Sequence, residues 1–138
     1  MKLNTVAGKT DKGRRLRARL VKISYYRAGR DEKGYATAIA RTYTPYDYDV
    51  HMKIVPAKDK NSRYVSSIKF TDKDLNVLVN CSCPDYMFRW SWANHKAGVG
   101  EHVYDNGEPP DIRNPSYRYQ LCKHLYALRQ LVKQKHGI

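Results

Sequence analysis

Two closely spaced pairs of metal-ligand residues restrict how this chain can fold more than any other feature. Cys81 and Cys83 flank one serine, and Cys122 and His124 flank one lysine near the C-terminus. Three Cys with one His complete a tetrahedral zinc shell that leaves no position for water. An odd number of cysteines, three here, argues against a closed set of disulfide bonds. We therefore predict one structural zinc ion at these four residues, over the alternative of buried cysteines without a metal.

The backbone around the two pairs must differ for all four ligands to reach one ion. The first pair follows a strand predicted at residues 75–79, and residues i and i+2 of an extended chain share a face. The second pair opens a predicted helix, where residues i and i+2 do not share a face. Cys122 must therefore lie in an irregular first turn with His124 just inside the helix, where free backbone N–H groups favour a thiolate. His95 and His102 are alternatives for the fourth ligand.

Hydrophobic periodicity predicts strands first and helices afterwards. Alternating or short apolar segments predict five strands, at residues 14–26, 35–44, 50–55, 64–70 and 75–79. A turn-rich sequence at residues 27–34 separates the first two strands. From Pro84 onward the apolar residues form two stripes with helical spacing, Tyr86, Trp90, Ala93 and Ala97 and then Leu121, Leu125, Leu128 and Val132. The predicted fold class is α+β: an antiparallel sheet of about five strands followed by two helices, held together by one zinc ion.

We predict that the chain divides into a flexible basic arm, residues 1–13, and a single α+β domain, residues 14–138. Within the domain, residues 14–63 are predicted to form basic, tyrosine-rich strands. Residues 64–138 are predicted to form the zinc unit, with a long insertion at residues 84–120. Trp90 and Trp92 cannot both face the core from one helix. We expect one of them either at a partner surface or beneath the loop at residues 98–120.

Basic residues are concentrated at the start of the chain. The net charge is +13, and residues 1–30 contain ten Lys and Arg against one Asp. We expect an anionic partner there, contacted by Arg14, Arg15, Arg17, Arg19, Lys22, Arg27 and Arg30. Six tyrosines are candidates for stacking on single-stranded bases, with packing in the core and on strand faces as the alternative: Tyr25, Tyr26, Tyr35, Tyr43, Tyr46 and Tyr48.

The pattern Cys81-Ser82-Cys83 followed by Cys122-Lys123-His124 resembles the SWIM-type zinc finger. The preceding hairpin sequence is also similar to that family, and the resemblance covers residues 64–136. It implies a ββα zinc unit that binds DNA or protein partners. The spacer between the two pairs is longer than is usual in the family, and this long form resembles small proteins of tailed bacteriophages.

These observations predict a non-enzymatic, zinc-stabilised structural protein of a bacteriophage virion, with other virion or assembly proteins and packaged DNA as partners. The alternative is a nucleic-acid-binding SWIM zinc-finger module in phage DNA or RNA metabolism. We find no catalytic pair and no phosphate-binding loop, and so expect no enzyme activity and no small-molecule substrate. No apolar run is long enough to span a bilayer. No apolar segment follows the basic N-terminus, so we expect no signal peptide. We therefore expect no membrane partner and a location in the virion or the host cytoplasm.

Overall fold

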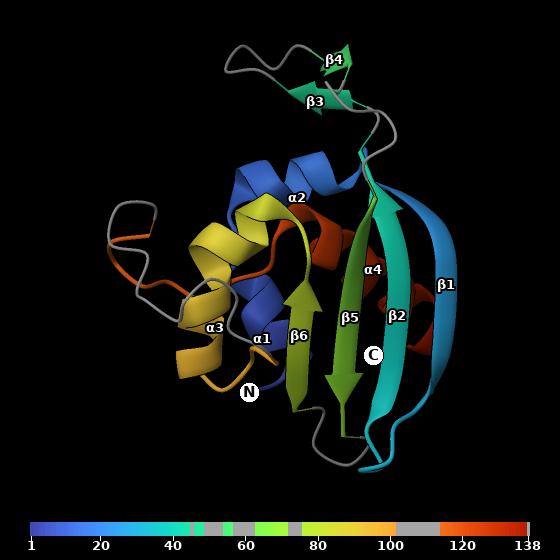
Figure 1. Cartoon of the computed structure of the whole chain (residues 1–138). Coiled ribbons are helices and arrows are strands. Elements are labelled where there is room, and N and C mark those ends of the chain that lie inside the picture. The colour runs from blue at the N-terminus through green and yellow to red at the C-terminus, as the bar shows by residue number, and fades with distance from the viewer. Residues whose placement is uncertain (45, 49–53, 57–62, 72–75, 102–113, 138) are drawn as a thin grey trace.

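The computed structural model describes residues 1–44, 46–48, 54–56, 63–71, 76–101 and 114–137. Its centre is an antiparallel sheet of four strands in the order β1-β2-β5-β6 (Figure 1). These strands are β1 (Lys22–Arg30), β2 (Ala36–Tyr43), β5 (Tyr64–Phe70) and β6 (Val77–Cys81). A separate two-stranded ribbon, β3 (Tyr46–Tyr48) with β4 (Ile54–Pro56), lies beyond one end of the sheet (Figure 1). The α+β class is confirmed, with four strands in the main sheet rather than about five.

Helices cover one face of this sheet, behind the strands in Figure 1. The C-terminal helix α4 (Lys123–His136) packs across β2, β5 and β6, and the shorter helices α1 (Leu3–Gly8) and α2 (Lys12–Ala18) pack against α4. Its buried residues Leu125, Leu128 and Val132 belong to the predicted apolar stripe. They face alternate buried residues of the strands: Ala38, Ala40, Ile68, Phe70, Val77 and Val79. No helix in the described ranges has the length and hydrophobicity needed to cross a membrane.

The N-terminal segment is folded, which corrects two predictions. The sequence predicts an arm at residues 1–13 and a strand at residues 14–26, but α1 and α2 occupy most of this region and β1 begins only at Lys22. Leu3 and Val6 lie one helical turn apart, and burying them together against the core fixes α1. The alternation of Leu and Arg in the next segment is therefore accidental, and its cations lie on a helix rather than on a strand face.

Two smaller features define where α2 starts and where β1 ends. The Asp11 side chain caps α2 by accepting a hydrogen bond of 2.9 Å from the backbone N–H of Arg14. The turn predicted at residues 27–34 is shorter, because residues 27–30 belong to β1. The turn itself is closed by Asp31, whose carboxylate accepts from the backbone N–H groups of Lys33 and Tyr35.

The described part of the insertion packs on the helical side and at the β6 edge. A π-helical turn, η1 (Tyr86–Trp90), leads into helix α3 (Ser91–Lys96), which matches the first predicted helical stripe. Asn94 is fully buried and binds the backbone of Gln120 in both directions, donating to its carbonyl at 2.9 Å and accepting from its N–H at 3.0 Å. The Trp92 ring lies against Tyr117, with centroids 5.0 Å apart. The loop therefore covers Trp92, one of the two outcomes that we expected.

The two edges of the sheet differ. Val99 and Glu101 run beside β6 and bond both backbone groups of Val79, at 2.7 and 3.0 Å. Gly100 between them permits this approach, because a Cβ atom there would lie 2.6 Å from the backbone nitrogen of His95. The outer edge of β1 has no strand beside it among the described residues. Within the described ranges, one sheet edge is thus paired with another segment and the other edge is not.

Candidate metal centre

The four predicted ligands meet in one buried cluster. The ligand atoms of Cys81, Cys83, Cys122 and His124 all lie within 4.8 Å of one another. The three cysteines are free thiols that are at most 1% exposed, and His124 is 3% exposed. This group could hold one metal ion and, because its residues are buried in the protein core, offers no open face to a substrate. The structure therefore brings together the residues that the sequence paired.

Cys81 owes its position to the register of the sheet. It is the last residue of β6 and follows Val77 and Val79 on the inward face. Its partner across the strands is Ser66 of β5, whose hydroxyl lies 3.2 Å from the Cys81 sulfur. A hydroxyl at this distance can donate to a thiolate, so Ser66 stabilises the form of Cys81 that binds metal.

The other two sulfurs each lie at the start of a helical segment. The backbone N–H of Tyr86 donates to the Cys83 sulfur at 3.4 Å, and the N–H of Leu125 donates to the Cys122 sulfur at 3.4 Å. Cys122 is the extended N-cap residue of α4. This confirms the irregular first turn that the Cys-x-His spacing requires. Both helix starts direct backbone N–H groups at sulfur atoms, which favours thiolates.

The imidazole of His124 has one partnered nitrogen and one unpartnered nitrogen. Its Nε2 lies 3.3 Å from the Thr44 hydroxyl, while Nδ1 is buried and has no hydrogen-bond partner among the described residues. The ring also packs against Tyr64, with centroids 5.0 Å apart. A buried nitrogen without a partner is costly, and ligation of a metal would satisfy it. Thr44 then holds the other nitrogen, as partners beyond the ligands do in metal sites.

The electrostatics of the cluster also fit a cation. Burial raises the pKa of the Cys122 thiol well above its ordinary value, and the neighbouring Cys81 and Cys83 sulfurs raise it further. Burial acts to raise the pKa of Cys81 as well, but hydrogen bonds from Cys122, Cys83 and Ser66 outweigh it and hold that pKa well below its ordinary value. Without a cation, one thiolate therefore opposes ionisation of the next. A divalent cation removes the conflict by binding all three thiolates.

His95, one of the two alternative histidines, is not part of this cluster. His95 is exposed on α3, and His102 lies outside the described residues. Sequence reasoning missed Ser66 and Thr44, because neither has a recognisable spacing to the ligands. A hydroxyl residue opposite Cys81 in the predicted hairpin register would have been the one available signal.

Arg14, which the sequence assigns to a partner surface, instead forms contacts within the chain. Its guanidinium makes a bidentate ion pair with Asp85 at 2.6 and 2.8 Å and a second ion pair with Asp11 at 2.7 Å. It also lies 4.7 Å over the Trp90 ring. The guanidinium holds the pKa of Asp85 below its usual value against the effect of burial, and it contributes to lowering the pKa of Asp11 to about 2. Arg14 thereby joins the start of α2 to the segment that follows Cys83.

The other six predicted contact residues lie along α2 and β1. Arg15 is exposed on α2 and Arg17 is partly buried there, while Arg19 is exposed at the C-cap position that follows α2. Lys22, Arg27 and Arg30 are exposed on β1. A groove of about 570 Å³ separates α2 from α4. It is lined by Lys12, Arg15 and Arg19 together with apolar side chains that include Leu16, Ile23, Tyr126 and Leu131, and none of the residues that line it is acidic.

Comparison with known proteins gives no match to this chain among protein-family models, curated proteins or solved structures. The similarity to SWIM-type zinc fingers and to phage proteins therefore stays a prediction. What the structure itself establishes is a buried Cys81, Cys83, Cys122 and His124 cluster that could bind one metal ion.

Proposed function

We propose that the chain is a non-enzymatic nucleic-acid-binding module that one structural zinc ion stabilises. Zinc is the metal that best suits a closed donor set of three thiolates and one imidazole. The cluster joins the end of β6, the start of η1 and the start of α4, so the metal serves the fold rather than a reaction. We therefore look for the function in the surface residues outside this cluster.

One observation carries the nucleic-acid proposal: exposed cations continue from α2 onto β1 with few acids among them. Arg15, Arg19, Lys22 and Arg27 are exposed along this path. The acids nearest in sequence are engaged within the chain, Asp11 with Arg14 and Asp31 in its turn. Such a surface attracts phosphate groups through counterion release.

The salt dependence of binding tests this function. The purified zinc-bound chain should bind a fluorescent 20-nucleotide strand or 20-base-pair duplex, with affinity falling at least about tenfold between 50 and 200 mM NaCl. Fluorescence anisotropy across that range would give the slope. Absence of binding at 50 mM NaCl, or affinity that does not change with salt, would contradict the proposal.

A second candidate function is the assembly role that the phage resemblance suggests, in which neighbouring subunits are the partners. Two features favour it: the exposed outer edge of β1, and the groove between α2 and α4 with its three cations. An exposed edge can pair with a strand of another chain, and a groove of this composition suits an acidic amphipathic segment.

Particle composition tests the assembly role. Quantitative mass spectrometry of gradient-purified particles of the encoding phage should find the chain at a fixed ratio to the major capsid protein. The ratio should survive a high-salt wash, because strand pairing and apolar contacts do not depend on surface charge alone. A chain that is absent from the particles would exclude this function, and loss in the wash would exclude strand pairing at the β1 edge as the contact.

A further inference from the structure

The face of the sheet that α4 does not cover has the composition of a binding surface. No helix lies over it in the part of the chain that the structure describes (Figure 1). Tyr25 of β1 is 48% exposed and Val65 of β5 is 47% exposed, and both belong to this face. Arg41 of β2 lies between them in the same cross-strand row. Large apolar side chains at this exposure on one face are typical of an interaction surface.

An irregularity in β1 places Tyr25 on this face. Ile23 pairs with Thr42 and Tyr25 pairs with Arg41, so Ser24 is an extra residue in the ladder. A bulge of this kind changes which way the following side chain points. Tyr25 therefore shares the open face with Arg41, while Tyr26 turns to the covered face and bonds His136 of α4 at 2.7 Å. Without the bulge, strict alternation would direct Tyr25 towards the core.

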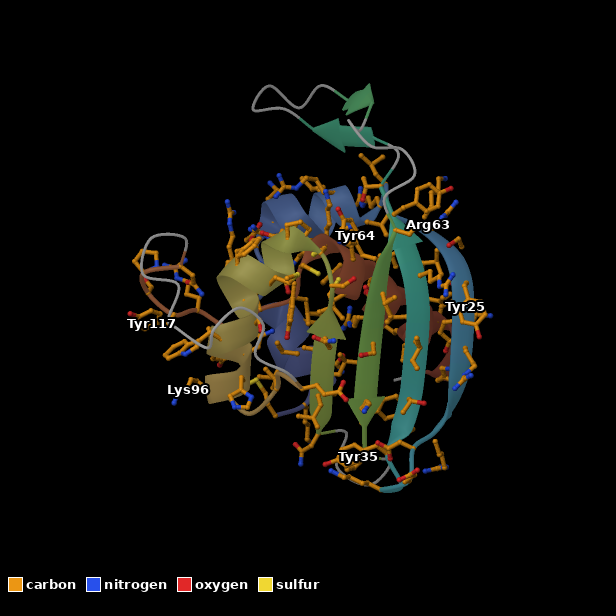
Figure 2. All side chains as sticks on the ribbon, viewed as in Figure 1. Tyr25, Tyr35, Arg63, Tyr64, Lys96 and Tyr117 are labelled. Carbon is orange, nitrogen blue, oxygen red and sulfur yellow. The ribbon has the colours of Figure 1, made fainter. Side chains whose placement is uncertain are left out.

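Cations surround the aromatic rings of the open face. The register places Tyr43 opposite Lys22 and puts it on the same face as Arg41, two residues earlier in β2. Arg63, just before β5, lies with its guanidinium 4.6 Å over the Tyr43 ring. Figure 2 shows Arg63 and Tyr25 on the same side of the molecule, and Tyr117 on the opposite side. Four exposed cations thus lie around two tyrosines: Lys22, Arg27, Arg41 and Arg63.

The same half of the face carries no acidic residue among those described. Its cross-strand rows run from Tyr25 through Arg41 to Val65 and from Arg27 through Ile39 to Ser67. Lys69, further along β5, is paired with Glu101 and belongs to the other half of the face. The charge of this half is therefore positive, which favours an anionic partner.

We propose that single-stranded nucleic acid binds to this open sheet face, with one base stacked on Tyr25 and phosphates held by Arg27, Arg41, Lys22 and Arg63. Aromatic rings among cations on an exposed sheet are what an unpaired strand needs, because every base offers a flat face and every linkage offers a charge. In a duplex the base faces are already stacked and cannot reach the ring. The inference rests on the proposed nucleic-acid binding, and adds to it the strand state and the surface.

A set of tyrosine variants tests the site. Tyr25→Ala should weaken binding of an oligo(dT) 20-mer at least about fivefold, because a base stacked on an aromatic ring is lost. Tyr25→Phe keeps the ring and should stay within about twofold of the wild type. Tyr117→Ala, an exposed tyrosine on the far side, is the matched control and should also stay within about twofold. Anisotropy measures affinity, and circular dichroism with metal content shows that each variant is folded.

A 20-base-pair duplex and a second variant separate the possible failures. Arg41→Ala should weaken the oligo(dT) complex and reduce its salt slope by about one, whatever happens at Tyr25. Wild-type affinity of Tyr25→Ala for oligo(dT), or equal losses in Tyr25→Ala and Tyr25→Phe, would overturn the sheet site while leaving nucleic-acid binding in place. Tight duplex binding that Arg41→Ala does not change would also overturn it. A wild-type chain that binds neither probe would overturn both proposals.

Discussion

His124→Ala should yield a chain that neither retains zinc nor unfolds cooperatively. The substitution removes the imidazole whose Nδ1 has no other described partner and leaves three buried thiols around a cavity. Structural zinc contributes on the order of 10 kcal/mol in zinc-finger peptides. A domain of this size has a net stability of roughly 5–15 kcal/mol. Loss of the metal is therefore enough to unfold the C-terminal half. Elemental analysis and a thermal melt followed by near-ultraviolet circular dichroism measure the two effects.

Two variants separate ligation from packing. His124→Cys changes the donor set to four thiolates, which also bind zinc in structural sites. It should retain the metal and most of the cooperative transition. His95→Ala removes an exposed histidine outside the cluster and should behave as the wild type in both measurements. A His124→Ala chain with stoichiometric zinc and an unchanged melting temperature would refute the assignment of this ligand.

Arg14→Met should destabilise the fold by about 2–3 kcal/mol without altering nucleic-acid affinity. Methionine keeps the packing of the side-chain stem over Trp90 but leaves Asp85, which is largely buried, without its bidentate partner. The expected loss is below that of a fully buried ion pair, because the side chains of Asp11 and Asp85 are 43% and 26% exposed. Urea unfolding at neutral pH measures the free energy, and anisotropy on the folded protein measures binding.

A double-mutant cycle measures how much of this loss comes from the Arg14–Asp85 ion pair. Adding Asp85→Asn to Arg14→Met should cost less than the sum of the two single changes, because each removes the same ion pair. Arg19→Met, at the exposed C-cap position of the same helix, should change stability by less than about 0.5 kcal/mol. Additive effects, or a large loss of affinity in folded Arg14→Met, would return Arg14 to the partner surface that the sequence predicts.

The parts of the fold that the sequence predicts well are those that one local rule determines. The strand at residues 64–70 has its predicted bounds, because its alternation is regular and both faces have their expected environment. Helix α4 carries its apolar stripe to Val132 and ends at Gly137, which adopts a left-handed φ of 68°. The Cys122 cap follows from the geometry of a Cys-x-His pair, and the structure has it.

The predictions that were wrong come from ambiguous local sequence patterns and from contacts between residues that are distant in the sequence. Leu16 and Ala18 fit the alternation of a strand. Asp11, however, is an N-cap residue whose side chain accepts from the Arg14 backbone N–H, and the segment forms helix α2. The pairing of Arg14 with Asp85 joins residues 71 positions apart. No spacing rule connects residues so far apart in the sequence. From the sequence alone, Arg14 in its charged segment is therefore interpreted as a solvent-exposed residue. The bulge at Ser24, which turns Tyr25 outward, is equally invisible to a period-two pattern.

The meeting of the two ends of the chain has a consequence for folding during synthesis. The Asp11 backbone N–H bonds the side chain of Gln120, and the N–H of Leu121 bonds the Thr10 hydroxyl at 3.2 Å. Both partners directly precede the ligand Cys122. While a ribosome makes the chain, α1 and α2 therefore have no complete docking site until Cys122 and His124 of the metal-binding cluster leave the exit tunnel. Contacts between residues this far apart in the sequence form slowly during folding. We expect the final folding step to be a single late event that captures the metal and orders the N-terminal helices together.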